Sequence, residues 1–136
     1  MKQVAMSDVA TYVGSISSLE SLYDAKSGGT NFTESLLIGH ETTGTLNAAE
    51  YNTGVGRGSL DALTEGDNNV AIGYQAAQTH TTGGKNIAIG YGAMNDTDAG
   101  STSLGSTENI FMGYDAGGGT WADAASNRNV SVGNYT

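Results

Sequence analysis

The sequence predicts an all-β fold, a parallel β-roll or β-solenoid of about six 17-residue coils. A five-residue pattern of Asn, apolar, any, apolar and Gly recurs along the chain, and its glycines fall at a nearly regular spacing. The unit between two glycines is too short to fold alone. Neighbouring units must therefore bury each other's apolar side chains, which is the behaviour of a solenoid.

The repeat is clearest at residues 69–73, 86–90, 109–113 and 129–133, and weaker copies lie at 35–39 and 52–56. The repeat glycines are Gly39, Gly56, Gly73, Gly90, Gly113 and Gly133. Their positions differ by 17, 17, 17, 23 and 20 residues. The last two units are therefore the same unit with six and three extra residues.

Each copy has the chemistry of a strand. Two large apolar residues, mostly β-branched, flank a middle residue that is small in most copies, and side chains two positions apart share one face of a strand. We expect the flanking residues to face inward and to stack from coil to coil as the core of the roll. This predicted repeat core consists of Val70, Ile72, Ile87, Ile89, Ile110, Met112, Val130 and Val132.

The small middle residues, such as Ala71 and Ala88, would then lie on a second face against which something packs closely. A single narrow roll buries few large apolar side chains relative to the conformational entropy lost when the chain is ordered. We therefore expect self-association, with three rolls sharing the face of the small residues.

Residues 1–30 lack the repeat and are predicted to be a helical attachment segment, followed by the β-roll domain over 31–136. In this segment Val9, Tyr12, Ile16, Leu19 and Tyr23 recur at spacings of three and four residues. That is the pattern of a short coiled coil. A single amphipathic helix, lying on the roll or on a partner protein, explains the same pattern equally well.

Two families share the repeat motif. Residues 69–73 and 86–90 resemble the head repeats of YadA-type trimeric autotransporter adhesins. The stretch from Gly66 to Met94 resembles the β-roll repeats of bacteriophage fibre proteins more closely still. The resemblance covers about residues 35–136. It implies a left-handed roll that forms homotrimers and is displayed on a surface.

The expected function follows from this resemblance. Autotransporter adhesins continue into a neck, a stalk and a membrane barrel, whereas this chain stops at Thr136 and shows no secretory leader after Met1 and Lys2. We therefore expect a virion surface protein, a bacteriophage fibre or capsid decoration acting in host-surface attachment or particle stabilisation. Residues 1–30 would bind other virion proteins. The alternative is the head of a bacterial cell-surface adhesin.

Composition excludes several classes of protein. The absence of Cys excludes disulfides, thiolate nucleophiles and Cys-ligated metals. A net charge of −9 argues against nucleic acid as a partner, because phosphate binding needs clustered Lys and Arg. No apolar run is long enough to insert into a membrane. The glycine-rich stretch 54–58 lacks the Lys of a phosphate loop, so no cofactor is expected.

The sequence gives little support for an enzyme. His40 and His80 are expected to be exposed ladder or loop residues. Asp96 and Asp98 resemble the start of a calcium loop, but the rest of the ligand pattern is missing, so they are weak candidates. A glycan-processing enzyme would need paired carboxylates. The repeat does not pair the available ones, which are Glu41, Glu50, Asp115 and Asp123.

Aromatic residues are the remaining candidates for binding. Tyr74, Tyr91 and Tyr114 share the position after the repeat glycine. They form either a structural ladder or a platform for sugar rings or partner proteins, such as a host-surface glycan or protein. Trp121 is either an interface anchor or a local core residue. The insertion over 95–108 interrupts the period, and such loops commonly carry recognition.

Overall fold

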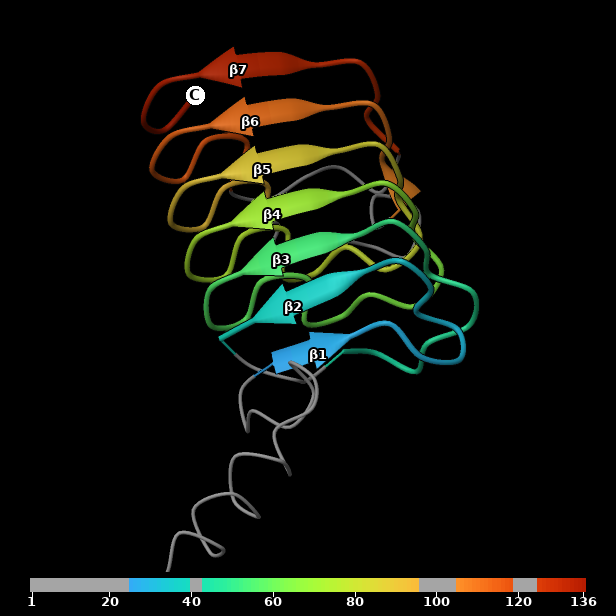
Figure 1. Cartoon of the computed structure of the whole chain (residues 1–136). Helices are drawn as coiled ribbons and strands as arrows, with labels where there is room; N and C mark the ends of the chain where they lie inside the picture. The colour runs from blue at the N-terminus through green and yellow to red at the C-terminus, as the bar shows by residue number, and fades with distance from the viewer. Residues whose placement is uncertain (1–24, 40–42, 96–104, 119–124) are drawn as a thin grey trace, which may run out of the picture.

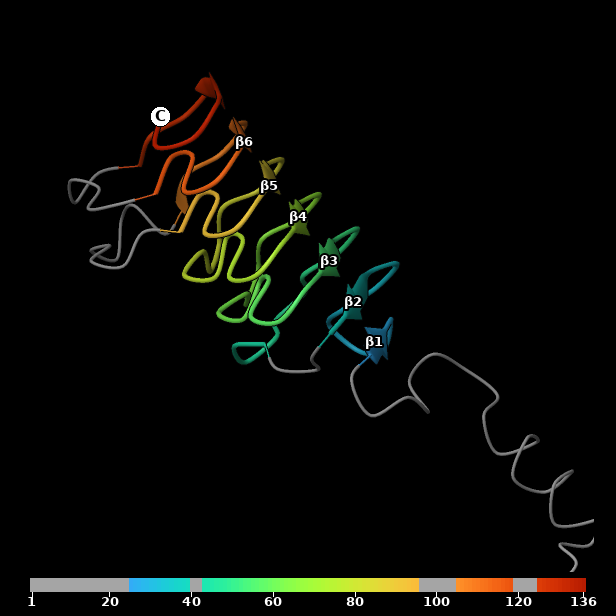
Figure 2. The same ribbon diagram turned by 90° about the vertical axis from the view of Figure 1, so that its left-hand side faces the viewer.

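The computed structural model describes residues 25–39, 43–95, 105–118 and 125–136, and within them the chain is a β-solenoid of about five turns without a helix (Figures 1 and 2). All its strands belong to one seven-stranded sheet whose order follows the chain. The strands are β1 (Ala25–Ser27), β2 (Leu36–Ile38), β3 (Thr53–Val55), β4 (Val70–Ile72), β5 (Ile87–Ile89), β6 (Ile110–Met112) and β7 (Val130–Val132). The predicted all-β solenoid is confirmed.

The coils stack in the predicted register. Strands β2 to β7 are parallel, and Val70 pairs with Ile87 while Ile72 pairs with Ile89. The two longer intervals do not shift the register, because Ile89 pairs with Met112 and Met112 with Val132. The extra residues therefore do not change which rungs pair.

The prediction of which strand face is buried was wrong. The middle residues point into the coil, where Leu37, Ala71 and Ala88 are fully buried. The interior is narrow because the strand and the returning chain of each coil lie close together, so it favours small side chains at this position. The large flanking residues therefore face outward. Val70, Ile72, Ile87, Ile89, Ile110, Met112, Val130 and Val132 are half-buried or exposed on the outer side of the sheet.

Large buried side chains are matched by glycines at the positions that they contact. Where the middle residue is Gly54, the side chains of Leu37 and Leu60 occupy the space that its missing side chain leaves. Where the middle residue is Phe111, the returning chain carries Gly117, whose position would otherwise collide with the Phe111 ring. Core volume is therefore nearly constant along the solenoid, as close packing requires.

A column of asparagines, the first residue of five of the motif copies, joins the coils, and all of them except Asn129 are buried. The Oδ1 of Asn69 accepts hydrogen bonds from the backbone N–H of Asn86 at 3.0 Å and from its Nδ2 at 3.1 Å. The Nδ2 of Asn69 also donates to the Gly83 carbonyl at 2.9 Å. Asn52, Asn109 and Asn129 repeat the pattern. Each side chain except that of Asn129 thus satisfies two backbone groups of the next coil, one at the asparagine of that coil and one in the turn before it.

The repeat glycines form a second column, at the bend after each strand. Gly73 and Gly90 have φ values of 133° and 136°, which L side chains rarely adopt. A methyl group on Gly56 would lie 2.6 Å from the Gly73 carbonyl oxygen, and the glycines above it are packed as closely. The bend therefore needs glycine both for its conformation and for the approach of the next coil.

The first strand lies inside the segment that the sequence predicts to be helical. Residues 25–27 were assigned to the helical segment over 1–30, but they form β1, which pairs antiparallel with β2. Gly28 N–H donates to the Ser35 carbonyl at 2.9 Å and closes the hairpin. β1 thus covers the first edge of the parallel sheet, a position that natural sheets commonly protect. The helix expected over residues 4–24 lies outside the described residues.

Replacing Gly90 by Ala is expected to lower the free energy of unfolding by roughly 2–4 kcal/mol, because the methyl group meets the Gly113 backbone at an unfavourable φ. The matched control is Gly92→Ala. Gly92 has a φ of 61°, and the neighbouring coils place Gln75 and Asp115 at its position. The control should cost about 1 kcal/mol. Urea unfolding followed by circular dichroism measures both, and equal losses would contradict the close stacking.

The balance of core volume predicts that one variant rescues another. Phe111→Ala should destabilise the chain by about 3–5 kcal/mol through a cavity. Gly117→Met alone should also destabilise it, because the new side chain meets the Phe111 ring. The double variant copies the β5 coil, which has Ala88 and Met94 at these positions, and should recover most of the stability. A double-mutant cycle measures the coupling, and additive losses would refute the balance.

Candidate functional site

The most prominent surface is the outer side of the sheet, which we call the outer sheet face. It is formed by the outward residues of β2 to β7. In the inner coils Ile38, Ile72 and Met112 are each about 40% exposed, while Val130 and Val132 of the last coil are about 70% exposed. Single exposed apolar residues are ordinary, but a contiguous apolar surface marks an interaction site.

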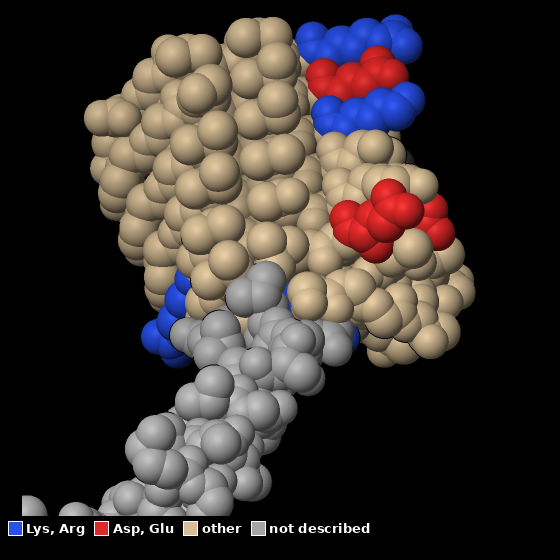
Figure 3. Space-filling model, in the orientation of Figure 1, with Lys and Arg blue, Asp and Glu red and all other residues tan. Residues whose placement is uncertain are grey.

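The outer sheet face carries no charge. Every outward position of its strands is apolar apart from Thr53. Figure 3 shows an uncharged surface over the strands, with most of the charged side chains at its right-hand border and Lys or Arg side chains at its lower left. A surface of this kind is suited to association with another apolar surface, because no ionised group has to be desolvated.

The predicted tyrosine ladder lies just beyond the strand ends. The rings of Tyr74 and Tyr91 stack with centroids 5.1 Å apart, and those of Tyr91 and Tyr114 at 5.0 Å. Tyr135 adds an edge-to-face contact with Tyr114 at 5.2 Å. A hydrogen bond with Tyr135 is the main cause that raises the pKa of the Tyr114 phenol.

The stacking limits what the tyrosines can bind. Both faces of the Tyr91 ring are covered, by Tyr74 and by Tyr114. A sugar ring usually packs on the flat face of an aromatic ring, and at Tyr91 that face is taken. The ladder instead presents ring edges and phenol groups to solvent. The ring edges carry partial positive charge and suit carboxylates, and the phenol groups suit hydrogen-bonding partners.

The opposite border of the sheet carries a second column, which we call the pre-asparagine column because each residue precedes a column asparagine. Its members are Tyr51, Asn68, Lys85, Glu108 and Arg128, and all have a left-handed backbone with φ of 58–62°. Glu108 stands between two cations, 2.7 Å from Arg128 Nε and 3.9 Å from Lys85 Nζ. The hydrogen bond from Arg128 and the charge of that residue lower the pKa of Glu108.

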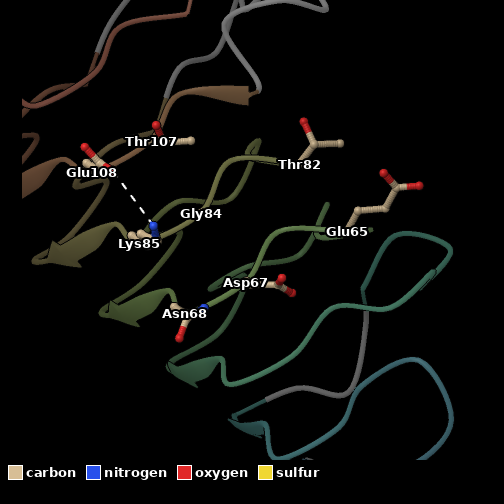
Figure 4. Close-up of a pocket in the computed structure, with 8 residues that line it drawn as sticks. All are labelled: Glu65, Asp67, Asn68, Thr82, Gly84, Lys85, Thr107 and Glu108. Atoms are coloured by element: carbon tan, nitrogen blue, oxygen red, sulfur yellow. Dashed lines mark ion pairs between the residues drawn. The ribbon is translucent and has the colours of Figure 1, made fainter.

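A polar hollow of about 280 Å³ lies beside the pre-asparagine column (Figure 4). It exists because Gly84 supplies no side chain between Asp67 and Thr107 on the neighbouring coils. Its carboxylates already serve the fold. Glu65 accepts from Asn47 Nδ2 at 2.8 Å, and Asp67 accepts from the Glu50 N–H at 2.8 Å. The hollow is therefore a gap in the ladder, beside carboxylates that hold neighbouring coils together.

Several predicted candidates lie outside the described residues, namely Trp121, Asp96, Asp98, His40, Glu41 and Asp123. Of the insertion over 95–108, only Asn95 and residues 105–108 are described. His80 was expected to be exposed and is instead buried, at 3% exposure. Among the described residues no group of three His, Cys, Asp or Glu side chains is placed to hold a metal ion.

Sequence reasoning missed the role of the motif asparagines and the existence of the pre-asparagine column. Both were visible as residues that keep a fixed place relative to the repeat glycine.

Comparison of the chain with protein-family models, curated proteins and solved structures gave no match. Within the described ranges, no helix is long and apolar enough to cross a membrane.

The ion pairs of Glu108 within the pre-asparagine column predict a pH-dependent contribution of this residue to the free energy of unfolding. Its pKa is lowered in the folded chain, so its contribution is full above the ordinary value of 4.5 and is lost as the pH falls through the folded value. Glu108→Gln should therefore destabilise the chain slightly at pH 7 and not at pH values below the folded pKa. Because these side chains are exposed, added salt should weaken the effect. Thermal unfolding of both proteins across pH tests this, and a difference that grows on acidification would contradict it.

Proposed function

We propose that the chain is a non-enzymatic structural module that assembles side by side into a homotrimer and is displayed on a virion surface. The observation that carries the proposal is the outer sheet face, an apolar surface that runs along the strands from β2 to β7. In the proposed trimer three left-handed rolls turn these faces toward a common axis. The face of large residues is then shared, in place of the face of small residues that the sequence predicted.

The energetics favour this arrangement. Each apolar side chain that becomes fully buried gains about 25 cal/mol for each Å² removed from water. Of the thirteen described residues in the buried hydrophobic core, seven are alanines, so the single chain buries few large side chains. Burying the outward Val, Ile and Met residues between copies supplies one. The assembled trimer would be a rod that is stiffened by its closely stacked strands.

The proposed site of display rests on the resemblance of the repeat to bacteriophage fibre β-rolls. In that role residues 1–30 attach the module to other virion proteins, and the roll projects outward as a fibre or a capsid decoration. It acts in host-surface attachment or in particle stabilisation. The alternative is the head of a bacterial cell-surface adhesin. Immunogold electron microscopy with an antibody against the chain separates the two, because gold on cells and not on particles would favour the adhesin.

Sedimentation equilibrium of the full chain tests the assembly. We expect a trimer at micromolar concentration. The double variant Ile72→Lys/Ile89→Lys should be a monomer, because it buries charges at the proposed interface. Gln78→Lys, on the returning chain of the β4 coil, is the matched control and should remain a trimer. Circular dichroism should show an unchanged β-spectrum for both variants. A monomeric parent chain, or a double variant that still assembles, would overturn the proposal.

A further inference from the structure

We propose that the two borders of the outer sheet face contact each other between neighbouring copies, coil against matching coil. This inference rests on the proposed self-assembly and adds the contacts that set how the copies are arranged. One border is the pre-asparagine column. The other is the post-glycine column, formed in the same coils by the residue after each repeat glycine, namely Arg57, Tyr74, Tyr91, Tyr114 and Asn134.

The two columns do not meet within one copy. The pre-asparagine column precedes the strands and the post-glycine column follows them, so they lie at opposite borders of the sheet (Figure 1). Tyr51 and Arg57, for example, are separated by the Asn52 rung, β3 and Gly56. At about 3.3 Å per extended residue, this places them roughly 15–20 Å apart. Any pairing between the columns must therefore involve a second copy.

Cyclic symmetry brings these borders together. A rotation about an axis parallel to the solenoid sets the strand-start border of one copy beside the strand-end border of the next. A closed ring involves no shift along that axis. Equivalent residues of all copies therefore lie at the same height, and in the proposed contact the rung of β3 on one copy faces the rung of β3 on its neighbour.

The rungs that would meet are chemically complementary. In the β3 coil the pre-asparagine residue is Tyr51 and the post-glycine residue is the cation Arg57. In the β5 coil the order is reversed, with the cation Lys85 in the first column and Tyr91 in the second. The β3 rung thus offers the Arg57 guanidinium and the Tyr51 ring, which attract each other. The β5 rung offers the Lys85 ammonium and the phenol oxygen of Tyr91, because the faces of that ring are covered by its neighbours. The cation and the tyrosine exchange columns between the two coils, and in both coils a cation faces a tyrosine.

The other rungs pair hydrogen-bonding groups. The β4 coil sets Asn68 opposite Tyr74, and the β6 coil sets the Glu108 carboxylate opposite the Tyr114 phenol. The β7 coil sets Arg128 opposite an amide. From β3 to β7, therefore, no rung places like charges against each other. A slip of one coil would leave Lys85 and Arg128 facing tyrosines, Tyr74 and Tyr114. It would set Arg57 against Asn68 and leave Tyr51 with no post-glycine partner among these five rungs, so the Tyr51–Arg57 pair distinguishes the matched register.

The residues of the β3 rung are available for such a contact. Tyr51 is 50% exposed and Arg57 is exposed. Among the residues that the structure describes, neither side chain has a hydrogen bond or an ion pair. The left-handed backbone at position 51 also accepts a cation, because Lys85 and Arg128 adopt nearly the same φ. Tyrosine already occupies the position equivalent to Arg57 in three other coils.

These equivalences allow a test by exchange. Tyr51→Arg places two arginines opposite each other and should raise the midpoint concentration of assembly by about tenfold or more, since three such contacts are lost in a ring of three. Tyr51→Arg/Arg57→Tyr restores the pairing with the roles reversed and should return the midpoint to that of the parent chain. Sedimentation equilibrium of the full chains measures the midpoints, and circular dichroism confirms folding of each variant.

A chemical crosslink gives a readout that does not depend on affinity. The chain contains no cysteine, so Lys85→Cys/Tyr91→Cys creates one defined pair of thiols. A short bismaleimide should join the thiol at position 85 of one copy to the thiol at position 91 of the next and give a covalent trimer on a denaturing gel. Lys85→Cys alone is the control and should remain a single chain, because equivalent borders do not meet.

The outcomes separate this inference from the proposed assembly. A trimeric parent chain, weakened by Tyr51→Arg and restored by the exchange, supports both. A trimer that is unaffected by Tyr51→Arg and gives no covalent trimer overturns the border contact and leaves the assembly standing. A monomeric parent chain overturns both.

Discussion

The width of the coil interior governs this molecule. Strand and returning chain lie so close that the central position of each strand holds alanine or glycine in the three regular coils, Gly54, Ala71 and Ala88. Larger central residues occur where a neighbouring position makes room for them, as Gly54 does for Leu37 and Gly117 does for Phe111. Because strand side chains alternate in direction, the large apolar residues on either side of the central one must face outward. The exposed apolar surface is therefore a consequence of how the coil itself is packed.

Stacking of the coils depends on backbone contacts at two columns. The asparagines tie each coil to its neighbour through bonds to backbone groups, and the glycines let the bends approach within contact distance. The returning chain adds backbone bonds of its own, such as that from Ala77 N–H to the Ala93 carbonyl at 2.9 Å. Extra residues can be inserted between Asn95 and Gly105 without disturbing the pairing of Ile89 with Met112. The solenoid tolerates insertions because the strands, the two columns and the returning chain all hold the register of each unit.

The period of the glycines and the apolar pairs was enough to predict the solenoid, its register and the tyrosine stack. The direction of the strand faces was not predictable from polarity, because both faces are apolar: Val70 and Ile72 on one side, Ala71 on the other. The deciding property was volume, and the sequence did carry a sign of it. Phe111 is followed by Gly117, where other coils have Leu60, Ala77 or Met94. The pairing of β1 with β2 had no periodic signal, since it occurs once.

An apolar face of identical rungs has little power to choose a partner or a register. Sliding one copy along another by a single coil would still bring Val and Ile against Val and Ile. Discrimination must come from positions that differ between rungs, and these lie at the borders, where Tyr51, Asn68, Lys85, Glu108 and Arg128 follow one another. Charged and polar groups at the rim of an interface contribute more to specificity than to affinity. In a repeat protein of this kind, the central face would supply the free energy of assembly, and the borders would determine which arrangement forms.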